Sequence, residues 1–114
     1  MSDCIFCKII RGEIPCTKVY EDDKVMAFDD IHPMAPVHVV IIPKNHISTL
    51  MDVDTEKVDI MNNLIAAAQK VAKIKKIDAS GFRVAINCNA EGGQVVFHLH
   101  VHVLGGRKLQ DELG

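Results

Sequence analysis

The feature that most constrains this chain is a run of alternating histidine and aliphatic residues near its C-terminal end. Residues 98–104 read His-Leu-His-Val-His-Val-Leu. Successive side chains of a β-strand point to opposite faces, so His98, His100 and His102 would share one face, with about 6.8 Å between neighbours. The aliphatic residues between them would enter an apolar core on the other face. Three of the six histidines of the chain fall on this short face, so we interpret it as a functional site.

The other elements are predicted from apolar spacing, turn residues and helix caps. Asp54 is a good N-cap for a long helix, and Pro43 closes a strand rich in β-branched residues. Helices and antiparallel strands occur in separate blocks without regular βαβ alternation, which favours the α+β class. We expect an antiparallel sheet of about five strands with one long helix and a short N-terminal helix. The expected helices cover residues 4–11 and 54 to 76 or 77, and the expected strands cover residues 17–20, 24–28, 37–42, 82–87 and 94–104.

The long helix carries two adjacent apolar stripes, wider than one contact with a sheet requires. Either the helix is deeply buried in the core, or its second stripe packs against another subunit. The pattern alone leaves both interpretations open. One stripe is Ile60, Leu64, Ala67, Val71 and Ile74, and the other is Met61, Ile65, Ala68 and Ala72.

Length and composition limit what the protein can be. A chain of 114 residues is expected to form a single domain, residues 1–114. Thirteen Lys and Arg against fifteen Asp and Glu give a net charge of −2, which argues against nucleic acid or an anionic membrane as the main partner. No apolar stretch approaches the ~20 residues of a membrane span, and no secretory signal is visible. We therefore expect a cytoplasmic protein whose four cysteines are thiols or metal ligands.

Two kinds of chemistry fit the row of histidines. Neutral imidazoles two residues apart on a strand can ligate one metal ion. Alternatively, one imidazole can act as a nucleophile, with others as acid and base. Like charges disfavour a fully protonated row, so at least one neutral nitrogen is expected. The spacing alone does not decide between these two chemistries.

Cys4 and Cys7 form a second candidate site. Two intervening residues place both sulfur atoms on one side of a helical turn, and two histidines from elsewhere would complete a tetrahedral zinc site. The alternative is ordinary buried packing of two thiols.

The motifs as a set resemble the histidine-triad (HIT) superfamily, in its Hint branch, over nearly the whole chain. The resemblance implies a HIT-like fold whose sheets join across a homodimer. It also implies a nucleotide hydrolase that cleaves the P–N bond of purine nucleoside 5′-phosphoramidates, with AMP or GMP derivatives as partners. The motifs are Ile5-Phe6, Phe28-Asp29-Asp30-Ile31, Pro36-Val37-His38, Ile42-Pro43-Lys44-Asn45-His46-Ile47, Gly92-Gly93-Gln94, His98 to Leu104, and Leu104-Gly105-Gly106-Arg107.

The same resemblance assigns roles residue by residue. His100 would be the nucleophile that carries a transient nucleotidyl group, His102 would contact the phosphate or leaving group, and His38 and His98 would complete the catalytic set. Asn87 and the backbone N–H groups around Gly93 and Gln94 would hold phosphoryl oxygens. Asp30 would accept hydrogen bonds from the ribose hydroxyls. The apolar slot for the base would be formed by Ile5, Phe6, Ile9, Phe28 and Ile31.

A subset of the superfamily also implies structural zinc on Cys4, Cys7, His46 and His98, with no catalytic metal. One departure is Val95, because relatives often carry a hydroxyl residue there that can hydrogen-bond near the leaving group. Two alternatives remain: an enzyme that cleaves dinucleoside polyphosphates, and a zinc-containing nucleotide-binding module with little catalysis.

Overall fold

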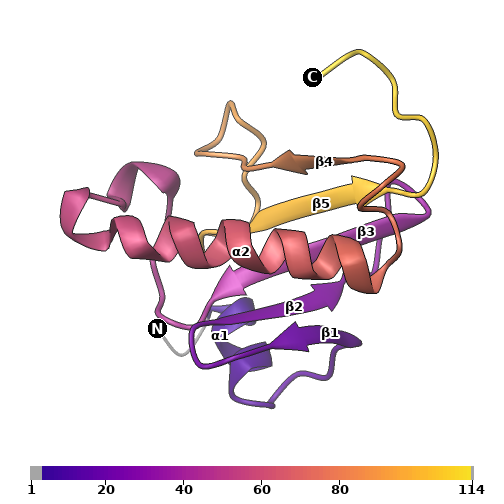
Figure 1. Cartoon of the computed structure of the whole chain (residues 1–114). Coiled ribbons are helices and arrows are strands. Elements are labelled where there is room, and N and C mark those ends of the chain that lie inside the picture. The colour runs from indigo at the N-terminus through magenta and orange to yellow at the C-terminus, as the bar shows by residue number, and fades with distance from the viewer. Residues whose placement is uncertain (1–3, 114) are drawn as a thin grey trace.

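The chain folds into one five-stranded antiparallel sheet with a helix on each face (Figure 1). The computed structural model describes residues 4–113. The order of strands in the sheet is β1-β2-β3-β5-β4. The predicted α+β class, with about five strands, one long helix and a short N-terminal helix, is confirmed. The elements are α1 Ile5–Ile10, β1 Lys18–Glu21, β2 Val25–Asp29, β3 Val37–Pro43, α2 Val58–Ile74, β4 Phe82–Ala85 and β5 Val101–Gly105, with 3₁₀ turns at Leu50–Asp52 and Thr55–Lys57.

The two faces of the sheet carry separate apolar clusters because side chains alternate along each strand. The larger cluster lies under α2, and the smaller one lies under α1, which Figure 1 shows behind β2. On β3, Val39 and Ile41 belong to the α2 cluster, and Val40 and Ile42 belong to the α1 cluster. The next residue of the α1 face in that alternation is His38, so the sheet itself directs this histidine to the side of α1.

The long helix starts and ends close to its predicted limits. The Asp54 side chain accepts the backbone N–H of Glu56 and so caps a 3₁₀ turn that leads directly into α2. The helix ends at Ile74, two or three residues before the predicted end. Both predicted stripes contribute to the core through Leu64, Ala67, Val71, Ala68 and Ala72. Ile74 and Ile65, one from each stripe, are about half exposed instead, because they lie at the margins of the buried face.

The predicted strand at residues 94–104 is too long. Regular pairing of β5 begins only at Val101, opposite Ile41 of β3. Before that point the backbone bonds to a loop, and the Leu99 N–H donates to the Ile47 carbonyl at 2.6 Å. The alternation nevertheless holds, since Leu99, Val101 and Val103 lie in the α2 cluster. β4 is also shorter than predicted and ends at Ala85 rather than at residue 87.

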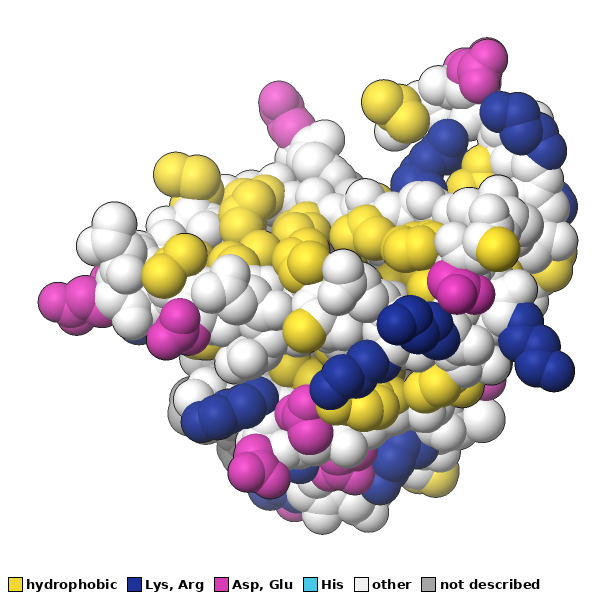
Figure 2. Space-filling model, in the orientation of Figure 1, with side chains coloured by type: hydrophobic (Ala, Val, Ile, Leu, Met, Phe, Trp, Pro, Cys, Tyr) yellow, Lys and Arg dark blue, Asp and Glu magenta, His cyan; other side chains and the backbone are white. Residues whose placement is uncertain are grey.

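Apolar side chains remain exposed at one edge of the molecule. β4 is an edge strand, and its Phe82 and Val84 are more than one third exposed, as is Ile65 on α2. Figure 2 shows hydrophobic side chains gathered over α2 and the neighbouring β4. In the part of the chain from residue 4 to 113, no helix has the length and apolar character needed to cross a membrane. The cytoplasmic location stays a prediction.

Candidate active site

The fold brings the four predicted catalytic histidines together on the α1 face of the sheet. His38 lies on β3, His102 on β5, and His98 and His100 on the segment before β5. The rings of three of them form a continuous series: the centroids of His100 and His102 are 5.0 Å apart, and those of His38 and His102 are 5.1 Å apart. The Phe6 ring of α1 contacts His98 and His100 edge-on, with centroids 5.8 and 5.1 Å away.

The position of the proton on His100 follows from a single backbone contact. His100 Nδ1 lies 2.8 Å from the His98 carbonyl oxygen, and the ring is buried. A carbonyl can only accept a hydrogen bond, so Nδ1 must carry the proton. In the neutral ring Nε2 is then unprotonated and keeps its lone pair. This is the form that a nucleophilic imidazole requires.

His38 and His102 are fixed in the opposite tautomer by a chain of two hydrogen bonds. The Met34 backbone N–H donates to His38 Nδ1 at 3.0 Å, so the neutral ring of His38 carries its proton on Nε2. His38 Nε2 lies 2.9 Å from His102 Nδ1 and donates to it. His102 therefore presents an Nε2–H as its free donor. Burial, together with the nearby His100 and His38, lowers the pKa of His102 to about 4, so the ring is neutral at pH 7.

Asp30 stands beside this pair at the end of β2. Its Oδ1 accepts the His32 backbone N–H at 2.8 Å, which holds the carboxylate in place. Its Oδ2 lies 3.4 Å from His38 Nε2, and the side chain is 22% exposed. The carboxylate is thus both adjacent to the histidines and accessible to a ligand.

The second predicted site is also assembled. Cys4 Sγ lies 3.3 Å from His98 Nδ1, and Cys7 Sγ lies 3.4 Å from His46 Nδ1 and 3.6 Å from His98 Nδ1. All four ligand atoms fall within 4.8 Å of one another. Tetrahedral zinc with its usual bond lengths separates S and N ligands by about 3.3–3.8 Å. These residues therefore fit a closed Cys₂His₂ zinc site.

His98 is oriented for that site rather than for the catalytic face. Its Nε2 lies 2.8 Å from the Pro43 carbonyl and donates to it, which leaves the Nδ1 lone pair facing the two sulfur atoms. The ring has no exposed surface, and burial lowers the pKa of His98 to about 4. The imidazole is accordingly neutral, the form that ligates metal. Its backbone carbonyl meanwhile holds His100, so His98 belongs to both clusters.

The residues predicted to form the base slot divide into two groups. Phe6, Ile9 and Phe28 are buried in the α1 cluster, where the rings of Phe6 and Phe28 lie 5.7 Å apart. Ile5 and Ile31 are exposed, and Ile31 is 85% exposed. The buried group forms the floor under the histidines, whereas the exposed group remains free to contact a ligand.

The predicted phosphate-binding residues lie on a turn before the histidine segment. A side chain added at Gly93 would lie 3.9 Å from the Asn87 amide nitrogen, and Gly93 has a φ of +84° that few other residues adopt. The N–H groups of Gly93 and Gln94 donate to the carbonyls of Ala90 and Asn89. They would have to share or open these bonds to hold a phosphoryl oxygen. Val95 is almost fully exposed.

The side chain of Gln94 has a role that the sequence did not indicate. It is buried and makes three hydrogen bonds, accepting from the Asn89 N–H and donating to the Ser48 and Val96 carbonyls. It therefore ties the turn to the loop that carries His46. No sequence pattern signals such a bridge, because all three partners are backbone groups, and that of Ser48 is far from Gln94 in sequence.

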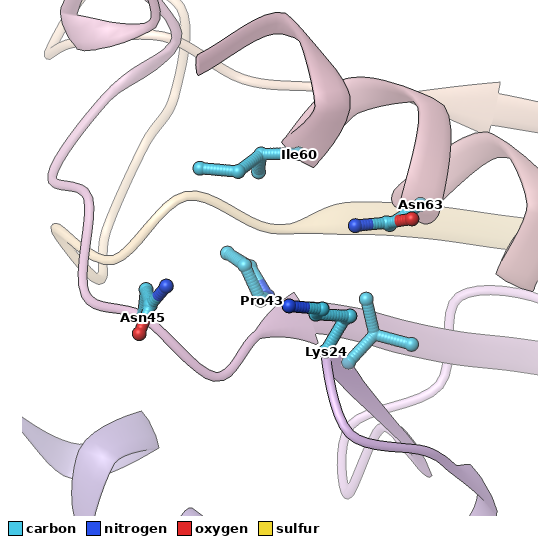
Figure 3. Close-up of a pocket in the computed structure, with 6 residues that line it drawn as sticks. Lys24, Pro43, Asn45, Ile60 and Asn63 are labelled. Atoms are coloured by element: carbon cyan, nitrogen blue, oxygen red, sulfur yellow. The ribbon is translucent and has the colours of Figure 1, made fainter. Parts of the chain in front are cut away.

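A small pocket elsewhere does not contribute to this chemistry. Figure 3 shows it between α2 and the end of β3, with Ile60 and Asn63 above and Pro43 and Asn45 below. Lys24 is its one ionisable lining residue. Among residues 4–113, no second ionisable side chain joins Lys24 in lining this pocket.

Comparison with known proteins identifies the class. The HIT domain family matches residues 11–109, so the chain belongs to the HIT domain family. It is 48% identical to the purine nucleoside phosphoramidase of Escherichia coli K12 over 107 residues, which cover 94% of this chain and 90% of that protein. The resemblance that the histidine motifs carry is thereby confirmed.

Two further relatives bear on the fold and on the cysteines. A histidine triad protein from Clostridium difficile superposes with a TM-score of 0.96 at 50% identity, covering 99% of this chain and 98% of that one. The 14 kDa zinc-binding protein of Brassica juncea is 48% identical over 94% of this chain and 96% of its own length.

Proposed function

We propose that this HIT-family nucleotide hydrolase cleaves purine nucleoside 5′-phosphoramidates through a covalent nucleotidyl intermediate on His100. The observation that carries the proposal is the 2.8 Å contact between His100 Nδ1 and the His98 carbonyl. It leaves Nε2 unprotonated without help from another base. The name of the Escherichia coli relative supports the choice of substrate class.

In the first step His100 Nε2 attacks the α-phosphorus and forms a P–N bond. The bond from phosphorus to the leaving nitrogen breaks, and its electron pair takes the Nε2 proton of a doubly protonated His102, so a neutral amine departs and His102 becomes neutral. In the second step water attacks the same phosphorus, His102 accepts the proton of that water, and His100 leaves with its lone pair restored. The products are a nucleoside monophosphate and an amine.

The nucleotide would lie between the histidines and the loop after β2. The Asp30 carboxylate, partly exposed beside His38, would accept the ribose hydroxyls. Ile31 and Ile5 offer exposed apolar surface for the base above the buried floor of Phe6, Ile9 and Phe28. The Asn87 amide and the turn at Gly93, Gln94 and Val95 would hold the phosphoryl oxygens as charge develops.

Zinc is proposed as a structural ion on Cys4, Cys7, His46 and His98. The spacing of these ligand atoms fits the ion, and the name of the Brassica juncea relative supports it. A closed four-ligand site supplies folding energy and leaves no open position for a substrate. In this role it would hold α1, and with it Phe6, against the histidine segment.

A homodimer is proposed through the exposed apolar band on β4 and α2. An unprotected edge strand with exposed Phe82 and Val84 is a template for pairing with another strand. Pairing of two copies of β4 would join the sheets and cover Ile65 as well. Of the second predicted stripe, only Ile65 would serve this contact, because Ala68 and Ala72 are buried in the core of the chain itself.

The test is mass spectrometry of the protein after rapid quenching with adenosine 5′-phosphoramidate. We expect an adenylyl adduct on the peptide that contains His100, and release of AMP in the steady state. A protein that turns the substrate over without any adduct would contradict the covalent step. Tight AMP binding without turnover would favour the binding module, and faster cleavage of a dinucleoside polyphosphate would favour the other hydrolase.

A further inference from the structure

We propose that Asp30 is a positioning residue that acts through His38 and allows His102 to hold the proton needed by the leaving nitrogen. The inference rests on the proposed function and deepens it. It gives the carboxylate a role in the chemistry besides any contact with the ribose.

Only one nitrogen of the His38 ring can carry its proton. The Met34 N–H occupies Nδ1, so the proton of His38 must lie on Nε2. That N–H donates to His102 Nδ1 at 2.9 Å. As long as it does, His102 Nδ1 cannot accept a proton, because two N–H groups would then face each other.

His102 nevertheless needs that second proton. A neutral imidazole that gave up its Nε2 proton would become an anion, so His102 can act as an acid only when both of its nitrogens are protonated. Protonation of Nδ1 requires the His38 N–H to turn to another acceptor. Asp30 Oδ2, 3.4 Å from His38 Nε2, is that acceptor.

The position of Asp30 suits this role. The Asp30 backbone N–H donates to the His38 carbonyl at 2.9 Å, and Oδ1 is held by the His32 N–H, so Oδ2 is left to face the histidines. The ionisable groups that act on His102 are His100, His38 and Asp30. The two histidines oppose an added proton, whereas the carboxylate raises the pKa of His102 against the effect of burial.

The test compares Asp30→Asn with Asp29→Asn. Asparagine at position 30 keeps the shape and the acceptor for the His32 N–H but removes the negative charge. Asp29 is the matched control, because its carboxylate is adjacent in sequence and instead pairs with Lys75 Nζ at 2.9 Å. Each variant is assayed with adenosine 5′-phosphoramidate and with the 2′,3′-dideoxyadenosine analogue, which lacks the ribose hydroxyls.

We expect Asp30→Asn to lower kcat about tenfold on both substrates, and to move the alkaline limb of the kcat profile to lower pH. The limb moves in this direction because loss of the carboxylate lowers the pKa of the acid. Asp29→Asn should change neither quantity. A kcat loss confined to the substrate with ribose hydroxyls would overturn the inference and leave Asp30 as a ribose contact alone.

Histidine NMR titration of the ligand-free protein provides a second readout that needs no turnover. The pKa of His102 should fall in Asp30→Asn and stay unchanged in Asp29→Asn. An unchanged His102 titration in Asp30→Asn would also overturn the inference. A wild-type protein that releases no AMP, yet shows the shifted titration, would reject the phosphoramidase proposal and keep the link between Asp30 and His102.

Discussion

Two histidine clusters share the α1 face of the sheet, and they differ in what surrounds each ring. In the first, His98 and His46 face the sulfur atoms of Cys4 and Cys7. In the second, His38 and His102 face each other and a carboxylate. His98 points its Nδ1 lone pair at the thiols, whereas His100, two residues later, has its Nδ1 turned to a carbonyl.

The comparison shows that backbone carbonyls decide which ring nitrogen of His98 and of His100 keeps a free lone pair. A carbonyl against Nε2 frees Nδ1, and a carbonyl against Nδ1 frees Nε2. The two clusters should therefore separate in experiment: changes in one should act on metal content and stability, and changes in the other on turnover.

Replacing the proposed nucleophile should have the largest effect. We expect His100→Ala to lower kcat on adenosine 5′-phosphoramidate by at least ~10⁴-fold, because the covalent route is lost. Zinc content should stay at the wild-type level. His32→Ala is the control, since this exposed histidine lies outside both clusters. Full activity in His100→Ala would refute the assignment of the nucleophile.

Removing a proposed thiol ligand should act on metal content and stability rather than on turnover. Cys4→Ser is expected to lose bound zinc and about 3–4 kcal/mol of unfolding free energy, the amount that a ligand at 100 to 1,000 times its Kd contributes. Metal analysis of protein purified without chelator and urea denaturation measure the two effects. Cys16→Ser is the control, because this thiol is outside the Cys/His cluster. Equal metal content and stability in both variants would contradict the proposed zinc site on Cys4, Cys7, His46 and His98.

His102, in the second cluster, should make the stability of the protein depend on pH. The pKa of His102 is lowered to about 4 in the folded state, against about 6.5 when the ring is solvated. Between these values the unfolded chain binds more protons than the folded one, so the free energy of unfolding should fall as pH falls from 6.5 to 4. His102 alone should account for up to about 3 kcal/mol of this loss in unfolding free energy.

Denaturation of wild type and His102→Asn across this pH range measures that share. The variant should have a shallower dependence on pH, and His32→Asn should keep the wild-type slope. If His102→Asn and wild type lose stability in parallel, the buried neutral state of His102 is not what carries the dependence.

The sequence predicted the faces of the histidine segment better than its secondary structure. Alternation correctly placed Leu99, Val101 and Val103 in the core. It could not locate the start of β5 at Val101, because strand pairing depends on β3, which is far away in sequence and pairs with β5 only as far as Ile41. The hydrogen bonds from the Met34 N–H to His38 and from His98 to the Pro43 carbonyl were not predictable either, since no sequence spacing pairs a histidine ring with a particular backbone group.

The sequence also predicted the types of residue in the site, but not the distances between them. Spacing and resemblance selected Asp30, His38 and His102 separately, but nothing in the chain indicated that Asp30 Oδ2 would lie 3.4 Å from His38. On α2, periodicity identified the buried stripes but not which of their members stay exposed, as Ile65 and Ile74 do.

The smallest predicted effect belongs to Phe6, which lies between Cys4 and Cys7 in sequence and contacts the rings of both His98 and His100. It is the side chain through which the two clusters touch. Phe6→Leu roughly preserves apolar volume but loses three edge-on ring contacts, including that with Phe28, so we expect a loss of about 1–2 kcal/mol in unfolding free energy. We also expect a few-fold loss in kcat, because the floor beneath His100 becomes less rigid.

Ile9→Leu is the matched control for Phe6→Leu. It is buried in the same short helix and the same apolar cluster, and its substitution should cost stability without lowering kcat. Urea denaturation and steady-state kinetics on both variants make the comparison. If Phe6→Leu lowers stability but leaves kcat unchanged, as Ile9→Leu should, the Phe6 ring does not support the nucleophile.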